Sequence, residues 1–422
     1  MSFPRYPQYK DSGVEWLGEV PEHWEVCALK RIVRMESGDG ITSEDIDESG
    51  LYPVFGGNGL RGYASKWNHN GDYVLIGRQG ALCGNINYAE GRFFASEHAV
   101  IATPLKTVIT RWLGEMLRAM NLNQYSISAA QPGLSVEVVG NLQVPFPMIN
   151  EQTLIAAFLD RETAKIDALV AEQERLIELL KEKRQAVISH AVTKGLNPDA
   201  PMKPSGIEWL GDVPEHWSYG SLCNFWEVVD CKHVTVPFMD SGFPVVSVME
   251  VRSFDLDLSQ VLRTDKLNYE LLISGGRQPV YGDIIYCRNT ANTGTSAYVN
   301  TQELIAVGQD VSLIKSRKQN GRYLNYILHG KRMADQLKSL MVGSTFKRIN
   351  VADIKKLKVQ CPPLAEQEAI VQFIETRLPV FDSLTAEAQR AITLLQERRT
   401  ALISAAVTGK IDVRNVAPTE AA

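Results

Sequence analysis

The sequence predicts an α+β protein in which two β-rich mixed domains are separated by an antiparallel two-helix coiled coil, with an internal pseudo-twofold repeat. Three observations lead to this fold class. A 15-residue motif occurs twice, a second repeated segment opens each of two long helical stretches, and the regions between the repeats are strings of short strands cut by turns. Constant segments that alternate with unlike inserts indicate two related domains on a common frame.

The two repeats follow different registers. The first reads KDSGVEWLGEVPEHW at 10–24 and KPSGIEWLGDVPEHW at 203–217, identical at 12 of 15 positions and 193 residues apart. The second pairs VPFPMINEQ at 144–152 with VQCPPLAEQ at 359–367, 215 residues apart. The two registers differ by 22 residues, so the second domain is 22 residues longer than the first between the two repeated segments.

A heptad pattern follows each copy of the second repeat. Apolar or seam positions alternate at spacings of three and four, charged residues fill the other face, and Pro379 is the one Gly or Pro inside the two stretches. A helix over the 43 residues 151–193 would reach about 64 Å and needs a partner, for which its own duplicate is the obvious candidate. Gly195 and Gly409 suit left-handed caps at the two helix ends. The predicted seam is Ile166, Leu169, Gln173, Leu176, Leu180, Lys183 and Val187 in the first stretch, and Phe381, Leu384, Ala388, Ala391, Leu395, Arg398 and Leu402 in the second.

Both globular segments show the same order of elements. Short strands separated by glycine turns lead into an amphipathic helix, near 110–122 in the first copy and 322–338 in the second. Each segment then closes with a helical turn and a strand, and Ser135 and Asn350 occupy matching N-cap positions. The glycine-rich GGNGLRG at 56–62 lacks the helix and lysine of a phosphate loop, so a turn between strands is the better interpretation.

These patterns set the predicted domain boundaries. They are a first domain at 1–150 containing the motif at 10–24, a central spacer helix at 151–195, a second domain at 196–360 containing the motif at 203–217, a C-terminal spacer helix at 361–410, and a tail at 411–422.

Composition limits the location and the partners. The formal net charge is −5, yet residues 312–358 hold 12 basic and two acidic side chains, a local charge of +10 that fits either a solvated face or a phosphate-binding surface. There is no run of 18 apolar residues and no signal-peptide pattern, so we expect a cytoplasmic protein with no membrane contact. The six cysteines are scattered without zinc-site spacing, which indicates reduced and mostly buried thiols.

The motifs of common catalytic sites are absent. The sequence has no phosphate loop, no dinucleotide fingerprint, no nucleophile elbow, no H-E-x-x-H and no N-P-P-Y or D-P-P-Y methylation motif. The repeated His23 and His216 could act as bases, but hydrogen-bonded histidines beside Trp24 and Trp217 are the better interpretation. We therefore expect no catalysis by this chain alone and read the tryptophan motif as packing between a domain and a helix end.

Four sets of residues together resemble the DNA-specificity (S) subunit of type I restriction–modification enzymes over essentially the whole length. They are the duplicated SGVEWLGEVPEHW and SGIEWLGDVPEHW, the two P-x₃-E-Q-x₂-I helix starts, AVISHAVTKGL and ALISAAVTGKI at the helix ends, and YPVFGGNGLRGY…VLIGRQGALCGNI…FFASEHAVI in the first domain.

The resemblance implies a function for each part. Each β-rich domain would be a target-recognition domain that reads one half of a bipartite, asymmetric double-stranded DNA site. The coiled coil would set the spacing and dock two modification subunits, which are adenine-N6 methyltransferases, and two restriction subunits could join them. S-adenosylmethionine, ATP and Mg would belong to those partners, and this chain would hold no cofactor or metal.

Polar residues beside glycine turns, or just before the capped helical turns, are the candidate DNA contacts. Arg, Gln and Asn suit bidentate reading of base edges, whereas Lys, Ser and Thr usually contact phosphates, also at a helix N-terminus. The candidates are Arg61, Arg78, Gln79 and Gln131 in the first domain, and Arg277, Arg288, Asn289, Ser344, Thr345, Lys347 and Arg348 in the second.

Two other functions remain open at this point. The first is a duplicated coiled-coil scaffold that binds only proteins and does not read DNA. The second is a self-contained nuclease or methyltransferase, which the missing motifs disfavour. The local +10 charge and the unlike domains favour DNA reading over the scaffold.

Overall fold

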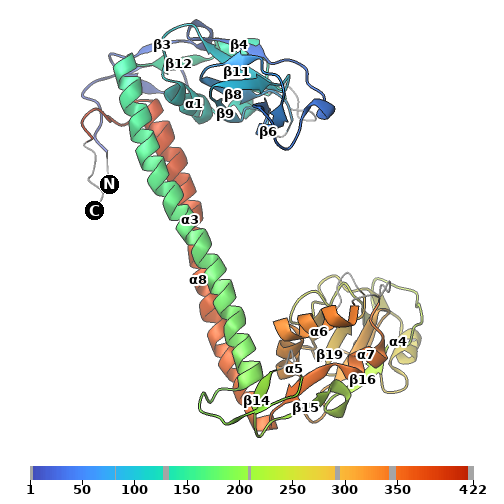
Figure 1. The fold of residues 1–422 in the computed structure, drawn as a ribbon. Coiled ribbons are helices and arrows are strands. Elements are labelled where there is room, and N and C mark those ends of the chain that lie inside the picture. The colour runs from blue at the N-terminus through green and yellow to red at the C-terminus, as the bar shows by residue number, and fades with distance from the viewer. Residues whose placement is uncertain are drawn as a thin grey trace. The chain divides into compact units, whose positions relative to one another are not determined.

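The computed structural model describes residues 3–80, 82–126, 133–207, 211–289, 295–341 and 348–416. Two long helices, α3 (Ile149–Lys194) and α8 (Leu364–Val407), run through a chain that divides into two units (Figure 1). Unit 1 comprises Met1–Glu174 and Gln389–Ala422, and unit 2 comprises Arg175–Ala388. Each unit thus holds one β-rich domain, here called head 1 or head 2, and part of both long helices.

Head 1 is built on two four-stranded sheets. One has the order β4-β11-β8-β9 with antiparallel neighbours, and the other has the order β6-β5-β10-β7, in which β5 and β10 are parallel. Its strands are β1 (Tyr9–Asp11), β2 (Glu19–Pro21), β3 (Glu25–Ala28), β4 (Val33–Ser37), β5 (Tyr52–Gly56), β6 (Gly59–Ala64), β7 (His69–Asn70), β8 (Tyr73–Gly77), β9 (Ile86–Ala89), β10 (Arg92–Ala95), β11 (Ala99–Pro104) and β12 (Gln143–Phe146), and its α-helices are α1 (Thr110–Ala119) and α2 (Val136–Asn141).

Head 2 repeats the main sheet with the order β16-β22-β19-β20, and its second sheet, β18-β17-β21, again contains one parallel pair. Small two-stranded pairs also recur, β1-β2 and β12-β3 in head 1 and β13-β14 and β15-β23 in head 2. The strands are β13 (Met202–Pro204), β14 (Asp212–Pro214), β15 (Ser218–Ser221), β16 (Glu227–Asp230), β17 (Phe243–Val246), β18 (Arg263–Thr264), β19 (Ile284–Cys287), β20 (Ser296–Tyr298), β21 (Ala306–Val307), β22 (Val311–Lys315) and β23 (Lys358–Cys361), and the helices are α4 (Lys266–Ile273), α5 (Gly321–Leu328), α6 (Lys331–Met341) and α7 (Val351–Lys356).

Several local expectations are confirmed and two are corrected. β5 and β6 form a hairpin through Gly57 and Asn58, so the glycine-rich stretch is a turn. The helix expected near 322–338 is instead α5 and α6, separated by His329 and Gly330, and the break lets the His329 ring reach the carbonyl of Ser296 at 2.7 Å. Helix α4 is not among the sequence predictions, although Asp265 caps it by accepting the Asn268 amide.

Each unit has a core that joins its head to the long helices. In unit 1, Trp24 and Trp112 are buried with Ile155 of α3 and Val407 of α8. In unit 2, Trp217 and Tyr323 are buried with Val192 of α3 and Ile370 of α8. Because a head and helix segments share one apolar core, the head is held by burial rather than by a flexible linker.

Within each unit an ion pair joins α3 to α8. Asp167 accepts from Arg399 at 2.9 Å in unit 1, and Arg184 lies 3.5 Å from Asp382 in unit 2. Arg184 and Arg399 are 215 residues apart, as are Asp167 and Asp382, so the two pairs are the same contact made twice. The second repeat register therefore applies to contacts as well as to sequence.

Burial follows the predicted seam at every second position. Ile166 and Leu180 are buried, but Leu169, Leu176 and Leu384 are 52%, 40% and 43% exposed. At the other predicted positions the following residue is more buried than the predicted one. Ile177 is buried instead of Leu176, and Ile392 instead of Ala391. Val187, Phe381, Leu395 and Leu402 are half-buried. Leucines of similar hydropathy flank the seam, and the pattern alone does not distinguish them from the residues that pack.

None of the helices in the described ranges is both long and apolar enough to cross a membrane.

Candidate nucleic-acid interface

In head 1 the end of a central strand meets the segment that precedes a short helix. Arg78 and Gln79 follow β8, the Leu134 amide donates to the Arg78 carbonyl at 2.9 Å, and Gln79 forms a β-bridge with Gly133. Ser135 then caps α2 by accepting the Val138 amide at 3.4 Å. Two candidate segments that are 55 residues apart in the chain are thus adjacent in space.

Head 2 makes the same junction. Arg288 and Asn289 follow β19, the Ile349 amide donates to the Arg288 carbonyl at 2.9 Å, and Asn289 bridges Arg348. Asn350 occupies the N-cap position of α7, but its side chain makes no capping hydrogen bond, unlike Ser135. The backbone contacts pair Arg78 with Arg288, Gln79 with Asn289 and Gly133 with Arg348 as structural equivalents.

The candidate side chains of head 1 differ in exposure. Arg61 and Gln79 are exposed, and the Arg61 stem lies against Gly56, where an added Cβ would meet its Cδ at 2.4 Å. Arg78 is half-buried and donates from Nη1 to the Ser37 hydroxyl at 2.9 Å. Gln131 lies outside the described residues.

In head 2 two of the candidates donate to Asp230, one to its side chain and one to its main chain. The Arg288 guanidinium is buried, donating to Asp230 Oδ1 at 2.5 Å and to the Ile349 carbonyl at 3.1 Å. Half-buried Arg277 donates to the Asp230 carbonyl at 2.9 Å. Ser344, Thr345 and Lys347 lie outside the described residues.

The candidate DNA contacts of head 2 differ in how far they are exposed to solvent. The DNA contact expected for Arg288 stays a prediction, and its burial weighs against direct contact in the conformation described here. Arg348 is exposed and pairs with Asp310 across the surface, and Asn289 is half-buried. Sequence patterns did not identify Asp230 or Asp310, because an isolated acidic residue after a strand carries no local signal.

The local excess of basic residues is partly neutralised within the fold. Lys315 and Arg317 lie 3.7 and 3.3 Å from Glu227, and Arg322 pairs with Asp255 and Glu375. The +10 charge counted over residues 312–358 therefore overstates the positive charge available to a ligand.

The repeated histidines join the tryptophan motif to the second repeat. His23 Nε2 lies 3.0 Å from Glu151, and His216 Nε2 lies 2.8 Å from Glu366. Tyr6 also donates to Glu151 at 2.6 Å, and burial together with this hydrogen bond raises the pKa of the Tyr6 phenol well above its ordinary value. The expectation of hydrogen-bonded histidines is confirmed.

The motif tryptophans pack against the helix ends as expected. An added Cβ on Gly195 would lie 3.2 Å from Trp217, and one on Gly409 would lie 3.1 Å from Trp24. Both glycines have positive φ, +76° and +74°, which confirms the left-handed caps. Trp16 packs partly buried on the core of unit 1, and Trp209 lies outside the described residues.

The glutamine of each second repeat anchors a head helix. Gln152 accepts the Ile109 amide at 3.0 Å before α1, and Gln367 accepts the Asn320 amide at 2.9 Å before α5. Each also donates to a proline carbonyl, Pro147 at 2.9 Å or Pro362 at 2.8 Å. These buried amides hold the head helix in register with the long helix.

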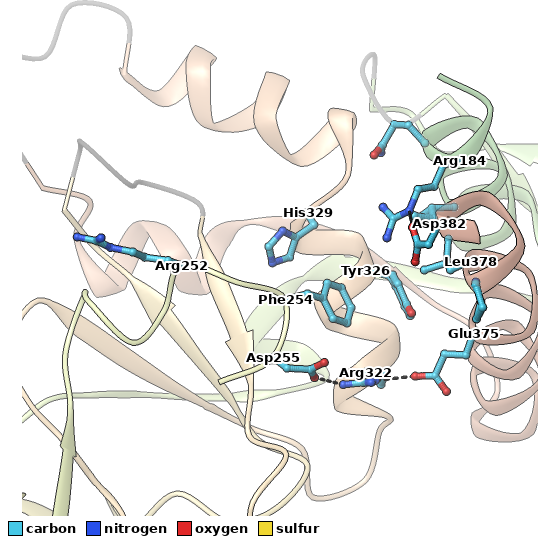
Figure 2. A pocket seen from close by; sticks show the side chains of 13 residues that line it. Arg184, Arg252, Phe254, Asp255, Arg322, Tyr326, His329, Glu375, Leu378 and Asp382 are labelled. Carbon is cyan, nitrogen blue, oxygen red and sulfur yellow. Dashed lines mark hydrogen bonds and ion pairs between the residues drawn. The ribbon is translucent and has the colours of Figure 1, made fainter. Parts of the chain in front are cut away.

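Unit 2 contains a cavity of about 660 Å³ between its head and the long helices (Figure 2). Two ion-pair groups lie along its walls, Arg184 with Asp382 and Arg322 with Asp255 and Glu375, and Phe254 and Tyr326 supply apolar surface. In unit 1 the equivalent arginine, Arg111, donates to Asp160 at 2.7 Å. The arginine contact is therefore part of the common framework.

Comparison with known proteins agrees with this architecture. The family described as the type I restriction modification DNA specificity domain matches residues 21–179 and 244–393, one match for each head with part of a long helix. The EcoprrI specificity subunit of Escherichia coli is 46% identical over 137 residues, which cover 32% of this chain and 34% of that protein. The MjaVIII specificity subunit of Methanocaldococcus jannaschii is 23% identical over 94% of this chain and 95% of its own length.

Solved structures share the fold at low identity. A chain from a study of complex assembly and conformational transition of the type I R-M system matches with a TM-score of 0.67 at 15% identity, covering 92% of this chain and 98% of that one. The HsdS subunit of Thermoanaerobacter tengcongensis matches with a TM-score of 0.54, also at 15% identity, covering 93% of this chain and 98% of its own. The chain therefore belongs to the family of type I restriction–modification DNA specificity subunits.

Proposed function

We propose that head 1 and head 2 are target-recognition domains that each read one half of a bipartite, asymmetric double-stranded DNA site. The two heads place different polar side chains, Gln79 and Asn289, at the same structural position, next to the same type of strand–helix junction. An asymmetric site requires two unlike reading surfaces, and a repeated framework with divergent side chains provides them.

The long helices are proposed to form an antiparallel coiled coil that sets the distance between the two half-sites. The repeated ion pairs, Asp167 with Arg399 and Arg184 with Asp382, support an internal pseudo-twofold relation between the halves. In this scheme residues 1–150 and 196–360 are the reading domains, 151–195 and 361–410 are the spacers, and 411–422 is a tail. Changing the spacer length would change the number of base pairs between the half-sites.

We propose that this chain is a non-catalytic subunit. Two modification subunits with adenine-N6 methyltransferase activity would dock on the repeated framework, because two copies of one partner need two equivalent surfaces. Two restriction subunits could join this assembly. S-adenosylmethionine, ATP and Mg would be bound by these partners, in keeping with the absence of their sequence motifs here.

The test is to express the chain with its modification partner in cells that lack other DNA methylation, and to map methyladenine across the genome. A two-part motif with a fixed gap, modified on both strands, is the expected result. A chimera in which head 2 is replaced by head 2 of another specificity subunit should change one half of that motif and leave the other half unchanged.

A protein-only scaffold predicts a different result. The methylation pattern would then be the same for the native chain and the chimera, since neither head would contribute to sequence choice. That outcome, obtained with a chimera that still assembles with the modification partner, would exclude DNA reading by this chain.

A further inference from the structure

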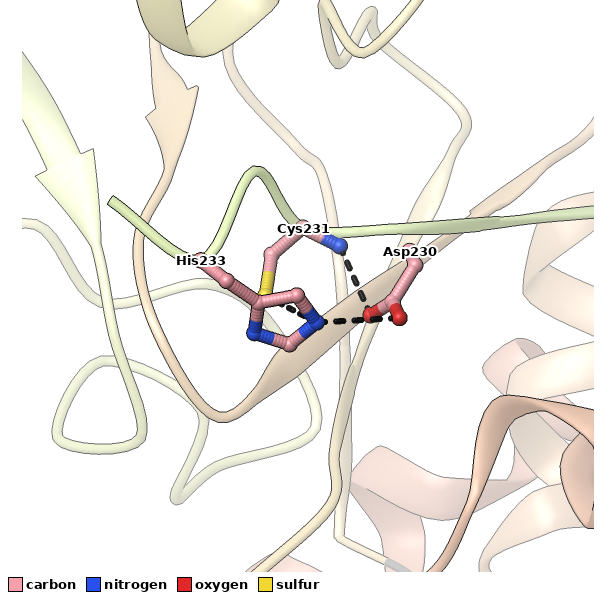
Figure 3. A group of neighbouring side chains, drawn as sticks. All are labelled: Asp230, Cys231 and His233. Atoms are coloured by element: carbon pink, nitrogen blue, oxygen red, sulfur yellow. Dashed lines mark hydrogen bonds and ion pairs between the residues drawn. The ribbon is translucent and has the colours of Figure 1, made fainter.

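Three side chains with metal-ligand chemistry meet at the end of β16 in head 2 (Figure 3). His233 Nε2 lies 3.0 Å from Asp230 Oδ2 and 3.9 Å from Cys231 Sγ, and the ligand atoms of the three residues all lie within 4.8 Å of one another. The thiol is buried, the carboxylate is half-buried and the imidazole is exposed.

The local backbone brings these side chains together. His233 has φ +55°, a left-handed conformation that is uncommon for residues other than glycine. This turn folds the imidazole back toward Asp230, the last residue of β16, and Cys231, which follows it. Spacing alone gives no such indication, because Asp230, Cys231 and His233 match no zinc motif and the sequence led us to expect no metal.

The Asp230 carboxylate is held from its other side. Oδ1 accepts Arg288 Nη1 at 2.5 Å and the Cys231 amide at 2.9 Å, while Oδ2 faces His233. Hydrogen bonds of this kind orient a carboxylate so that one oxygen is presented to a metal ion.

We propose that Cys231 Sγ, His233 Nε2 and Asp230 Oδ2 bind one Zn²⁺ ion. Zinc bonds of about 2.3 Å to sulfur and about 2.0–2.2 Å to nitrogen and oxygen place neighbouring tetrahedral ligands roughly 3.3–3.6 Å apart. This range lies between the 3.0 Å from His233 Nε2 to Asp230 Oδ2 and the 3.9 Å from His233 Nε2 to Cys231 Sγ, so small movements of the exposed imidazole would bring the three atoms to zinc-binding distances. The mixture of thiolate, imidazole and carboxylate favours zinc over magnesium or calcium. Binding releases the thiol proton, and three protein ligands leave the fourth position to solvent.

Head 1 lacks this site at the equivalent position. Ser37 ends β4 where Asp230 ends β16, and it accepts from Arg78 as Asp230 accepts from Arg288. Gly38 follows Ser37, and an added Cβ on it would lie 2.1 Å from the Ala95 carbonyl oxygen, so no side chain fits there. The metal would thus be specific to head 2, where it would fix the carboxylate that holds Arg288.

The test uses the full chain, stripped with a chelator and titrated with Zn²⁺ against a chromophoric competitor. One ion per chain is expected, and Co²⁺ in its place should give thiolate-to-metal absorption in the near ultraviolet. Cys231→Ser should weaken Zn²⁺ binding by more than about tenfold and abolish that absorption. Cys223→Ser, which changes an exposed cysteine of the same head, is the matched control and should bind as the parent does.

His233→Ala provides a second variant that does not disturb the core, since the imidazole is exposed. It should retain the fold by circular dichroism and weaken zinc binding by a similar factor. A parent chain that binds no zinc, or equal affinity in the parent, Cys231→Ser and His233→Ala, would disprove the site. Both results are independent of whether the chain reads DNA.

Discussion

Head 1 and head 2 each have an arginine at the same structural position, but the two arginines donate to different partners. Arg78 ends a central strand of head 1 and donates to the neutral Ser37 hydroxyl, whereas Arg288 ends the matching strand of head 2 and donates to the Asp230 carboxylate. The first guanidinium is half-buried and the second is 6% exposed. The arginine that donates to a hydroxyl is thus half-buried, and the arginine that donates to a carboxylate forms a buried ion pair.

The contacts between head and helix show the opposite behaviour. His23 and His216 pair with glutamates, Gln152 and Gln367 cap the head helices, and each unit has one arginine that bridges to a long helix. Where each head meets the long helices, equivalent positions hold the same types of side chain and make the same contacts. At the strand–helix junction, equivalent positions other than the arginine hold different side chains. The framework therefore constrains the backbone of the junction but leaves its side chains open to change.

The largest expected effect tests the shared framework. Trp24→Ala and Trp217→Ala each remove a fully buried indole at a helix end, and each should lower the free energy of unfolding of its unit by about 3–5 kcal/mol. Chemical denaturation of the whole chain measures this loss. Trp67→Ala, at 43% exposure under Arg92, should cost no more than about 1 kcal/mol. If one buried tryptophan proved dispensable, the two junctions would not be equivalent.

The two glycine caps should differ in a measurable way. Gly409→Ala places Cβ 2.4 Å from Pro21 Cδ, whereas Gly195→Ala places Cβ 3.0 Å from the nearest atom, a Glu366 carboxylate oxygen. An alanine in the left-handed conformation should lower the free energy of unfolding by about 1–2 kcal/mol at either position, and Gly409→Ala should lower it by at least about 1 kcal/mol more.

Gly13→Ala is the control for these caps, because its φ is +68° and no atom lies within 4 Å of the added Cβ. In thermal unfolding the loss of stability should be smallest for Gly13→Ala, larger for Gly195→Ala and largest for Gly409→Ala. Equal losses for all three would mean that backbone conformation, not contact with the motif, accounts for the cost.

Sequence choice should respond head by head. Gln79→Ala should relax recognition in one half-site and Asn289→Ala in the other, each by about 1–3 kcal/mol per base pair contacted. Arg348→Ala should weaken DNA binding by the assembled enzyme and reduce its salt dependence. Methylation mapping and filter-binding titrations measure the two effects. Lys181→Ala, on the exposed side of α3, is the control and should change neither, while identical motif changes from Gln79→Ala and Asn289→Ala would contradict a two-reader assignment.

The smallest expected effect is one of pH. Arg118 in head 1 donates to the Ile86 carbonyl, and His329 takes the matching position in head 2, where burial lowers the pKa of its imidazole. The folded state then binds a proton less tightly than the unfolded state. Stability from this group is complete above the ordinary pKa of about 6.5 and is lost as the pH falls below it, by at most about 1.4 kcal/mol per pH unit.

His329→Gln should therefore flatten the fall in melting temperature between about pH 6.5 and pH 5. Burial also lowers the pKa of His69 in head 1, so part of the slope should remain. His190→Gln, which alters an exposed histidine on α3, is the control and should leave the parent slope in place. An unchanged slope in His329→Gln would show that the buried ring does not titrate in this range.

The repeats made the architecture readable without coordinates. Two registers located the heads and the long helices, because a helix of this length needs an uninterrupted heptad and strands need regular turns. The caps at Gly195 and Gly409 and the paired histidines were also predictable, since each depends on residue types at fixed local spacing. The seam was predicted at every second position and missed by one residue at the others, because Leu176 and Ile177 have nearly the same hydropathy.

Sequence patterns were enough to indicate the family, the two-headed plan and the segments that contain the candidate DNA contacts. Contacts between distant segments were needed to find that Gln79 and Asn289 are equivalent, that Arg288 is buried against Asp230, and that Cys231 and His233 lie beside the same carboxylate. Backbone periodicity is a local property and appears in the sequence. The burial of a charge depends on which distant strand lies beside it, and strand pairing is fixed only when the whole sheet is assembled.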